Sequence, residues 1–168
     1  MSVSVVEIVR AVQLNAVSLT AESSGYLLLA IIDAGGLAGP VPADQMILLE
    51  NGEFRLGAVA RRDSSAAASD LRALLGRLMA LCSATHPPLA AVSCAEGSDF
   101  AQSLLAALIP VNRAAAKRTL ARTCRETDRA VRAGKLTDLG PAWQWLQGPS
   151  AQKSNPTPHV EKPAPAPA

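Results

Sequence analysis

The sequence predicts a mainly α-helical domain with one small β-hairpin, and three observations support this prediction. Aromatic residues make up 3% of the 168 residues while alanine is abundant, so Leu, Val, Ile and Ala must form the core, a composition that favours helices. Apolar residues recur at helical spacing in most segments of the chain. Only residues 42–60 read as two short strands around a turn.

The first third of the chain predicts two helices. Ser4 is a suitable N-cap for a short first helix. The apolar face of this helix consists of Val5, Ile8, Val9 and Val12. A second helix is expected from Leu19 or Thr20, with Thr20 as a candidate cap, to a stop at Gly35-Gly36. Its apolar residues cover almost the whole circumference, which is typical of a buried central helix.

The β-hairpin is expected next in the chain. Ile47–Leu49 is an apolar strand, Glu50-Asn51-Gly52 is a turn, and Glu53–Leu56 alternates polar and apolar residues as a half-buried return strand does.

The middle of the chain predicts a third helix followed by a loop. After a polar, flexible segment over residues 61–68, Ser69 and Asp70 are expected to open the helix. Pro87-Pro88 is expected to break the chain, with a loop that runs to about Ser98.

Two more helices and a closing element are predicted before the tail. One helix covers Asp99–Ile109, is capped by Ser98 or Asp99 and ends at Pro110. The next runs from about Ala114 to Ala133, where Gly134 stops it. A short closing turn or helix carries Trp143, Trp145 and Leu146. Residues 148–168 are rich in Pro and Ala, so we expect a folded domain over 1–147 and a disordered tail.

Composition narrows the classes of function. The formal net charge of +2 is too small to indicate that the protein surface as a whole binds nucleic acid or a membrane. No targeting segment is visible, and the longest apolar run, Tyr26–Ile32, is too short to span a bilayer, so we expect a cytoplasmic protein. The three cysteines lack metal-ligand spacing, and neither histidine lies in a catalytic motif. We therefore predict no metal, no cofactor and no catalytic residue.

The order of these elements resembles the C-terminal lobe of a protein kinase. Residues 4–9 resemble the short helix after the kinase hinge, 19–35 the long central helix, 69–71 the start of the buried central helix, and 141–143 the Pro-Trp element that closes the lobe. In kinases the hairpin lies between the His-Arg-Asp loop and the Asp-Phe-Gly motif. The resemblance spans most of residues 1–147 and implies a kinase-C-lobe-like helical domain.

The residues that perform phosphoryl transfer in kinases are replaced in this chain. The His-Arg-Asp triplet falls on Gly39-Pro40-Val41, the metal-binding asparagine on Met46, and the Asp-Phe-Gly triplet on Ala58-Val59-Ala60. The resemblance begins at residue 1, so the Gly-rich loop and the β3 lysine have no counterpart. It therefore implies a protein that is not an enzyme and does not bind ATP.

A kinase C-lobe without catalytic groups is similar to the kinase non-catalytic C-lobe domain, or KIND domain. That resemblance implies an adaptor or scaffold that binds a segment of a partner protein, and self-association is compatible with it. A degenerate pseudokinase C-lobe of independent origin fits the same residues.

An arginine-rich helix is the strongest candidate for the binding surface. Five arginines recur at spacings of four, three, four and three and therefore share one helix face: Arg118, Arg122, Arg125, Arg129 and Arg132. Leu120, Cys124 and Val131 are expected to pack into the domain on the opposite side. Trp143 and Trp145 are expected either to pack on the core or, if exposed, to serve as binding anchors.

The arginine face has three interpretations besides an acidic or helical segment of a partner protein. It is a solvated face whose arginines pair with acids of the same domain, or it attaches the protein to an anionic membrane, or it binds nucleic acid. Nucleic acid is disfavoured because aromatic residues are not interleaved with the arginines. An unrecognised enzyme is a further alternative, and its polar groups would be Asp33, Asp44, Arg61, Arg62, Asp63 and Asp70.

Overall fold

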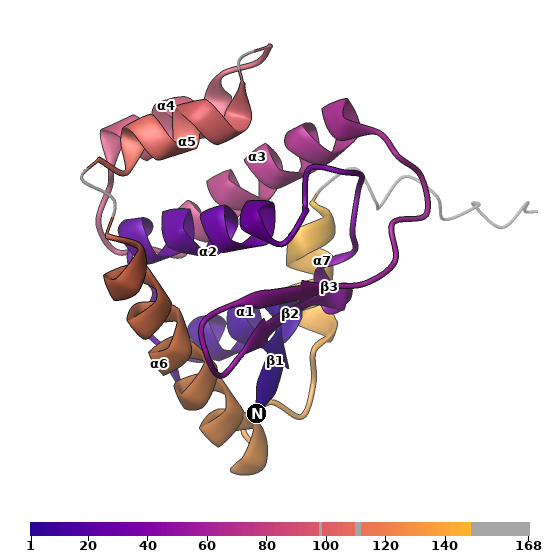
Figure 1. The fold of residues 1–168 in the computed structure, drawn as a ribbon. Helices are drawn as coiled ribbons and strands as arrows, with labels where there is room; N and C mark the ends of the chain where they lie inside the picture. Colours follow the sequence, from indigo (N-terminus) through magenta and orange to yellow (C-terminus); the bar gives the residue numbers. More distant parts are fainter. Residues whose placement is uncertain (98, 110–111, 149–168) are drawn as a thin grey trace, which may run out of the picture.

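The computed structural model, which describes residues 1–97, 99–109 and 112–148, is mainly helical and has a small three-stranded antiparallel sheet (Figure 1). In chain order, the elements are β1 (Ser2–Ser4), α1 (Val5–Gln13), α2 (Ala21–Asp33), η1 (Ala43–Gln45), β2 (Met46–Leu49), β3 (Phe54–Leu56), α3 (Ser64–Ala80), α4 (Pro87–Cys94), α5 (Phe100–Ala107), α6 (Arg113–Arg132) and α7 (Gly140–Gln147). The mainly helical class that the sequence predicts is confirmed.

The first helix begins where the sequence predicts, but a strand precedes it. Ser4 Oγ accepts a hydrogen bond from the Glu7 N–H at 3.2 Å, and the Glu7 carboxylate accepts one from the Ser4 N–H at 2.6 Å. This reciprocal capping box fixes the start of α1. Residues 2–4 form β1, which pairs antiparallel with β2 and places Ser2 opposite Leu49. The prediction of a lone hairpin was incomplete, because a strand of three residues is too short to show alternation.

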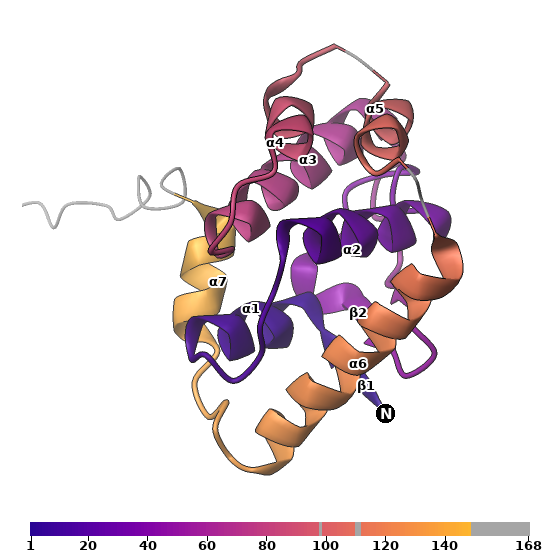
Figure 2. The same ribbon diagram turned by 90° about the vertical axis from the view of Figure 1, so that its left-hand side faces the viewer.

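Helix α2 lies at the centre of the molecule. Thr20 caps it as predicted, with its hydroxyl accepting a hydrogen bond from the Ser23 N–H at 3.1 Å. Figure 2 shows α2 with α3, α4 and α5 on one side and α1, α6 and the sheet on the other. The approach to the neighbouring helices is close at Gly25, where an added Cβ would lie 2.7 Å from Leu108 Cδ2. This helix therefore needs apolar or small residues on nearly every side.

The predicted hairpin is confirmed as β2 and β3, with β2 in the middle of the sheet. Gly52 in its turn has a φ of +81°, a conformation that glycine adopts without strain. A Cβ at this position would also collide with the backbone carbonyl of Lys117 in α6. The hairpin turn therefore lies directly against the backbone of α6.

The predicted start of α3 at Ser69 and Asp70 was wrong. The helix begins at Ser64, because Asp63 is its N-cap and accepts a hydrogen bond from the Ala66 N–H at 2.9 Å. The residues between Asp63 and Asp70 are alanines and serines, which occur both in helices and in loops. They therefore do not show which of the two aspartates precedes the helix. Asp70 is an exposed residue within the helix and not its cap.

The predicted loop after Pro87-Pro88 was also wrong. These prolines occupy the first turn of α4, where a missing backbone N–H costs no helical hydrogen bond. His86 caps the helix, with Nδ1 accepting from the Leu89 N–H at 3.3 Å. The prolines therefore begin a helix that the sequence interpretation had treated as a break.

The remaining helices agree with the predicted order. Asp99 caps α5 and Asn112 caps α6, and Gly134, with a φ of +68°, follows the end of α6. Helix α7 packs on α1, and its buried residues are Ala142 and Leu146. The predicted stop at Pro110 and the predicted tail beyond Gly148 lie outside the described residues. No helix in the described ranges is both long enough and apolar enough to cross a lipid bilayer.

One buried hydroxyl on α6 allows a test of the core. Thr127 is fully buried, and its Oγ1 has no hydrogen-bond partner within the described part of the chain. Thr127→Val removes this unpaired hydroxyl and keeps the shape of the side chain, so we expect a gain of about 1 kcal/mol in the free energy of unfolding. Urea denaturation followed by circular dichroism measures it.

Thr123→Val is the matched control, because the buried Thr123 hydroxyl donates to the Thr119 carbonyl at 3.2 Å. No gain in stability is expected for this variant. Equal losses in the two variants would contradict the assignment of an unpaired hydroxyl at Thr127.

Candidate functional site

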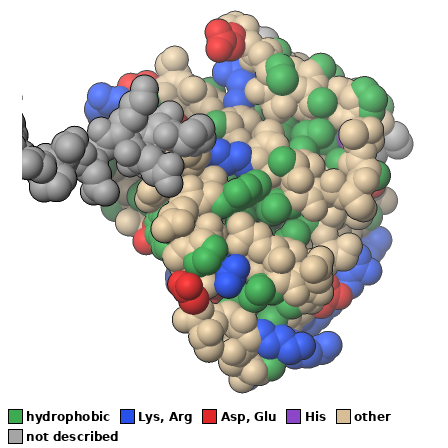
Figure 3. Space-filling model, turned by 180° about the vertical axis from the view of Figure 1, so that it is seen from behind, with side chains coloured by type: hydrophobic (Ala, Val, Ile, Leu, Met, Phe, Trp, Pro, Cys, Tyr) green, Lys and Arg blue, Asp and Glu red, His purple; other side chains and the backbone are tan. Residues whose placement is uncertain are grey.

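The five predicted arginines lie on the outward face of α6, and we call them the arginine stripe. All five are exposed. At 3.6 residues per turn they fall within about 80° of the helix circumference. The buried residues on the opposite side of α6 include Ala116, Leu120, Thr123, Cys124, Thr127 and Ala130. In Figure 3, which views the molecule from behind, basic side chains gather at the right and lower edge, where α6 lies.

Two arginines of the stripe are paired within their own helix. Arg122 Nε lies 3.9 Å from Glu126 Oε1, and Arg132 Nε lies 2.7 Å from Asp128 Oδ2. The other three, Arg118, Arg125 and Arg129, make no ion pair or side-chain hydrogen bond with the residues that the structure describes. The stripe thus combines two partly neutralised guanidinium groups with three that are available to a partner.

The apolar side of α6 agrees with the prediction at two of three positions. Leu120 and Cys124 are buried, and the Cys124 thiol lies 3.5 Å from the Leu48 carbonyl of the sheet. Burial raises the pKa of this thiol. Val131 is 37% exposed, so its predicted packing was wrong. The last turn of α6 extends past the elements that cover the rest of the helix (Figure 2).

The two tryptophans do not join the arginine stripe. Trp143 and Trp145 are half-buried on α7 and pack against the hydrophobic core. Helix α7 packs on α1, and Figures 1 and 2 both place α7 and α6 on different sides of the molecule. A single ligand segment on α6 therefore does not contact both sets of residues.

A pocket of about 230 Å³ opens between α2, the hairpin turn and α6. Five side chains with little exposure form its apolar floor: Tyr26, Leu29, Phe54, Ala116 and Leu120. Four charged residues line it as well: Asp33, Glu53, Arg113 and Lys117. Sequence reasoning included Asp33 among its polar candidates but missed the two cations, which lie off the arginine stripe.

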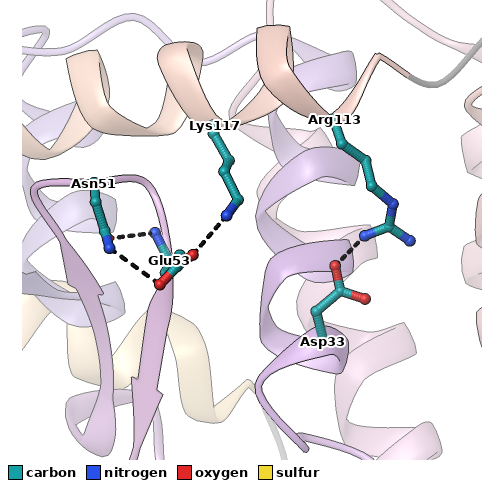
Figure 4. A network of polar contacts seen from close by, with 5 residues as sticks. All are labelled: Asp33, Asn51, Glu53, Arg113 and Lys117. Carbon is teal, nitrogen blue, oxygen red and sulfur yellow. Dashed lines mark hydrogen bonds and ion pairs between the residues drawn. The ribbon is translucent and has the colours of Figure 1, made fainter.

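Two ion pairs connect α6 to the other walls of this pocket (Figure 4). Arg113 pairs with Asp33, the last residue of α2. Lys117 Nζ lies 2.5 Å from Glu53 Oε1, and Asn51 Nδ2 donates to Glu53 Oε2 at 3.0 Å. The hydrogen bond and charge of Lys117, followed by the hydrogen bond from Asn51, lower the pKa of Glu53. The four charged side chains are about half exposed.

The only tyrosine of the chain contributes to the same pocket. Tyr26 donates its phenolic hydrogen to Glu22 Oε1 at 2.5 Å. This hydrogen bond, together with burial and the negative charge of Glu22, raises the pKa of Tyr26 to about 12. The phenol therefore stays protonated to a higher pH than that of an unperturbed tyrosine.

A second hollow, of about 330 Å³, lies where the resemblance places the kinase catalytic residues. Pro40, Val41, Ala58 and Ala60 line it, together with Asp70 of α3. The two loops lie side by side, since the Asp63 N–H donates to the Ala38 carbonyl at 3.2 Å and a Cβ on Gly39 would collide with the Arg61 carbonyl.

Two of the polar residues of the enzyme alternative, Asp33 and Asp70, line different pockets. Asp33 lines the first pocket, Asp70 lines the second hollow, and Arg61 pairs with Asp63 at 2.9 Å. Within the described ranges, no group of three or more His, Cys, Asp or Glu side chains is arranged to hold a metal ion. Comparison of the chain with protein families, with curated proteins and with solved structures finds no match.

Gly52 allows a test of the contact between the hairpin and α6. In Gly52→Ala the Cβ strains the positive φ and collides with the Lys117 carbonyl, so we expect a loss of more than about 1 kcal/mol in stability. The Glu53 pKa is expected to rise toward its ordinary value as the hairpin moves away from Lys117, which NMR titration of the Glu53 carboxyl measures. Gly134→Ala is the control, because its φ is also positive but an added Cβ meets no atom within 4 Å. Equal losses of stability in both variants would exclude a collision between the Gly52→Ala side chain and the Lys117 carbonyl.

Tyr26 allows a test of the pKa shift in the first pocket. Absorbance titration of the single tyrosine is expected to give a pKa of about 12 in the folded protein, against 10.0 for an unperturbed phenol. Because the folded-state pKa is raised, this stabilisation is complete below pH 10 and is lost as pH rises toward 12. In Glu22→Gln the pKa is expected to fall. An unchanged Tyr26 pKa in that variant would contradict the role of Glu22.

Proposed function

We propose that this domain is a non-catalytic protein-interaction module, an adaptor or scaffold that binds an acidic segment of a partner protein through the arginine stripe. The observation that carries the proposal is the placement of Arg118, Arg125 and Arg129. These three guanidinium groups lie opposite the buried face of α6 and lack an acidic partner in the described residues. A row of like charges without local neutralisation favours an anionic ligand.

The spacing of the three unpaired arginines favours a helical partner segment. They lie seven and four residues apart, so they extend over about 16 Å at 1.5 Å per residue. A second helix with carboxylates at the same spacing presents a matching row of charges. Each carboxylate accepts a charge-assisted and, with correct geometry, bidentate hydrogen bond from a guanidinium group.

The buried apolar face of α6 and the composition of the stripe favour a protein partner over a membrane or a nucleic acid. Surface-binding helices insert an apolar face into the lipid, whereas the apolar face of α6 packs on the domain core. Proteins that bind single strands stack bases on aromatic side chains, and the stripe contains only arginines along its length. Binding of α6 to a membrane or to a nucleic acid therefore relies on charge alone, and added salt weakens it strongly.

The kinase C-lobe resemblance supports the same class of function. The loop of residues 39–41 lies beside residues 58–60, as a catalytic loop lies beside the Asp-Phe-Gly segment in a kinase lobe. The start of α3 at Ser64 departs from that pattern. We infer a kinase-C-lobe-like domain that acts without ATP, and Mg-ATP is expected to leave its melting temperature unchanged.

Selection from a display library of random 16-residue peptides tests the proposal. We expect enrichment of sequences that repeat Asp or Glu at helical spacing. Their binding, measured by fluorescence anisotropy of synthetic labelled copies, is expected to weaken at least tenfold in Arg125→Glu/Arg129→Glu. The control Arg55→Glu/Arg62→Glu carries the same change in charge on exposed residues outside α6 and is expected to bind normally.

Two outcomes would contradict the proposal. Enrichment without acidic residues would exclude an acidic partner, and equal weakening in the two double variants would show only a general effect of charge. Co-sedimentation with vesicles of phosphatidylserine and phosphatidylcholine, and anisotropy with a labelled oligonucleotide, test the two alternatives. Binding to either that exceeds binding to the selected peptides would favour that alternative.

A further inference from the structure

Two acidic residues of α6 flank the arginine stripe. Glu126 follows Arg125 in the sequence, and Asp128 precedes Arg129. With about 100° between successive residues, Glu126 lies about 80° to one side of the centre line of the stripe and Asp128 about 80° to the other. Their side chains are 40% and 14% exposed, respectively. The stripe therefore has a carboxylate on each side at the level of Arg125 and Arg129.

The ion pairs within α6 involve the two outermost arginines of the stripe. Arg122 lies about 40° from the centre line, on the same side as Glu126, and pairs with it at 3.9 Å. Arg132 lies about 40° from the line on the side of Asp128 and pairs with that residue at 2.7 Å. The three arginines without an ion pair in the described residues lie within about 20° of the line. Full positive charge is therefore confined to a narrow row, and the charge changes sign toward both edges.

This arrangement acts on the width of a ligand's acidic surface. A carboxylate that faces the centre line meets unpaired guanidinium groups, whereas a carboxylate on the flank of a docked helix approaches Glu126 or Asp128. Two like charges about 6 Å apart in water change an equilibrium constant about threefold. The flanking carboxylates therefore favour a ligand with one row of acids and disfavour a ligand that is acidic all round.

We propose that the stripe selects a partner helix whose acidic residues form a single narrow row, with neutral or basic residues on both sides of it. Glu126 and Asp128 are the specificity-determining residues, because they repel broadly acidic segments and do not attract the acidic row itself. Glu126 has the larger role, since its side chain is the more exposed of the two. The inference rests on the proposed function of the stripe and narrows the class of its partner.

Two stapled helical peptides of the same length test the proposal by fluorescence anisotropy. Both carry four Glu at spacings of four, three and four, which are the spacings of the first four arginines of the stripe and read the same in either direction. The narrow peptide has Gln on both sides of this row, and the broad peptide has Glu at two of these flanking positions. The full chain is expected to bind the narrow peptide about threefold more tightly, although the broad peptide carries two more negative charges.

Variants of the flanking residues locate the effect. Glu126→Gln/Asp128→Asn removes both flanking charges and leaves every arginine in place, so the ratio of the two dissociation constants, broad over narrow, is expected to fall about threefold or more. Glu126→Gln alone is expected to produce most of this fall, and it provides a second variant if the change at Asp128 prevents folding. The matched control Asp44→Asn/Glu96→Gln makes the same change in net charge on exposed residues outside α6, and its ratio is expected to equal that of the wild type.

Failure of this inference is distinguishable from failure of the proposed function. The selection of a narrow row is wrong if the wild type binds the broad peptide more tightly, if the ratio is unchanged in both flanking variants, or if it falls equally in the control. Each of these results leaves an acidic partner of the stripe intact. If neither peptide binds, the proposed function is wrong, and this inference is wrong with it.

Discussion

The structure depends on the need to cover α2 on almost every side. Its apolar residues surround the helix axis, so other elements must bury it from several directions. Helices α3 and α5 pack on one side, while α6 and the sheet pack on the other. At Gly25 the absence of a side chain lets Leu108 and Leu89 approach closely. The order of the elements around α2 follows from this constraint and places α2, the hairpin and α6 beside one another.

Features specified within a few residues were predictable from the sequence. The caps Ser4 and Thr20 were identified, and Asp99 was one of two candidates, because a cap and the backbone it binds lie three residues apart. The hairpin and the arginine stripe were identified by periodicity. The start of α3 was missed because Asp63 and Asp70 are both plausible caps, and α4 was missed because a proline can begin a helix as well as end one.

The pocket could not be predicted, because its charges come from distant parts of the chain. Asp33 and Arg113 are 80 residues apart, and Glu53 and Lys117 are 64 residues apart. Only the packing of α6 across α2 and the hairpin brings them together. The stripe is formed by one helix and shows in the sequence, whereas the pocket is formed by three elements and depends on the tertiary structure. Helix α6 thus lines the pocket with one side and carries the stripe on another.

The division of α6 into an inner and an outer side has a consequence for how such a protein changes over time. Substitutions on the outer side touch no core residue, so their effects on stability are small. A lineage can therefore change the charges on this face without passing through unstable intermediates. The inner side is constrained by the close approach of the hairpin turn to the Lys117 carbonyl, by the ion pairs and by the core, so selection for folding alone preserves it. Divergence between descendants should concentrate on one face of a single helix.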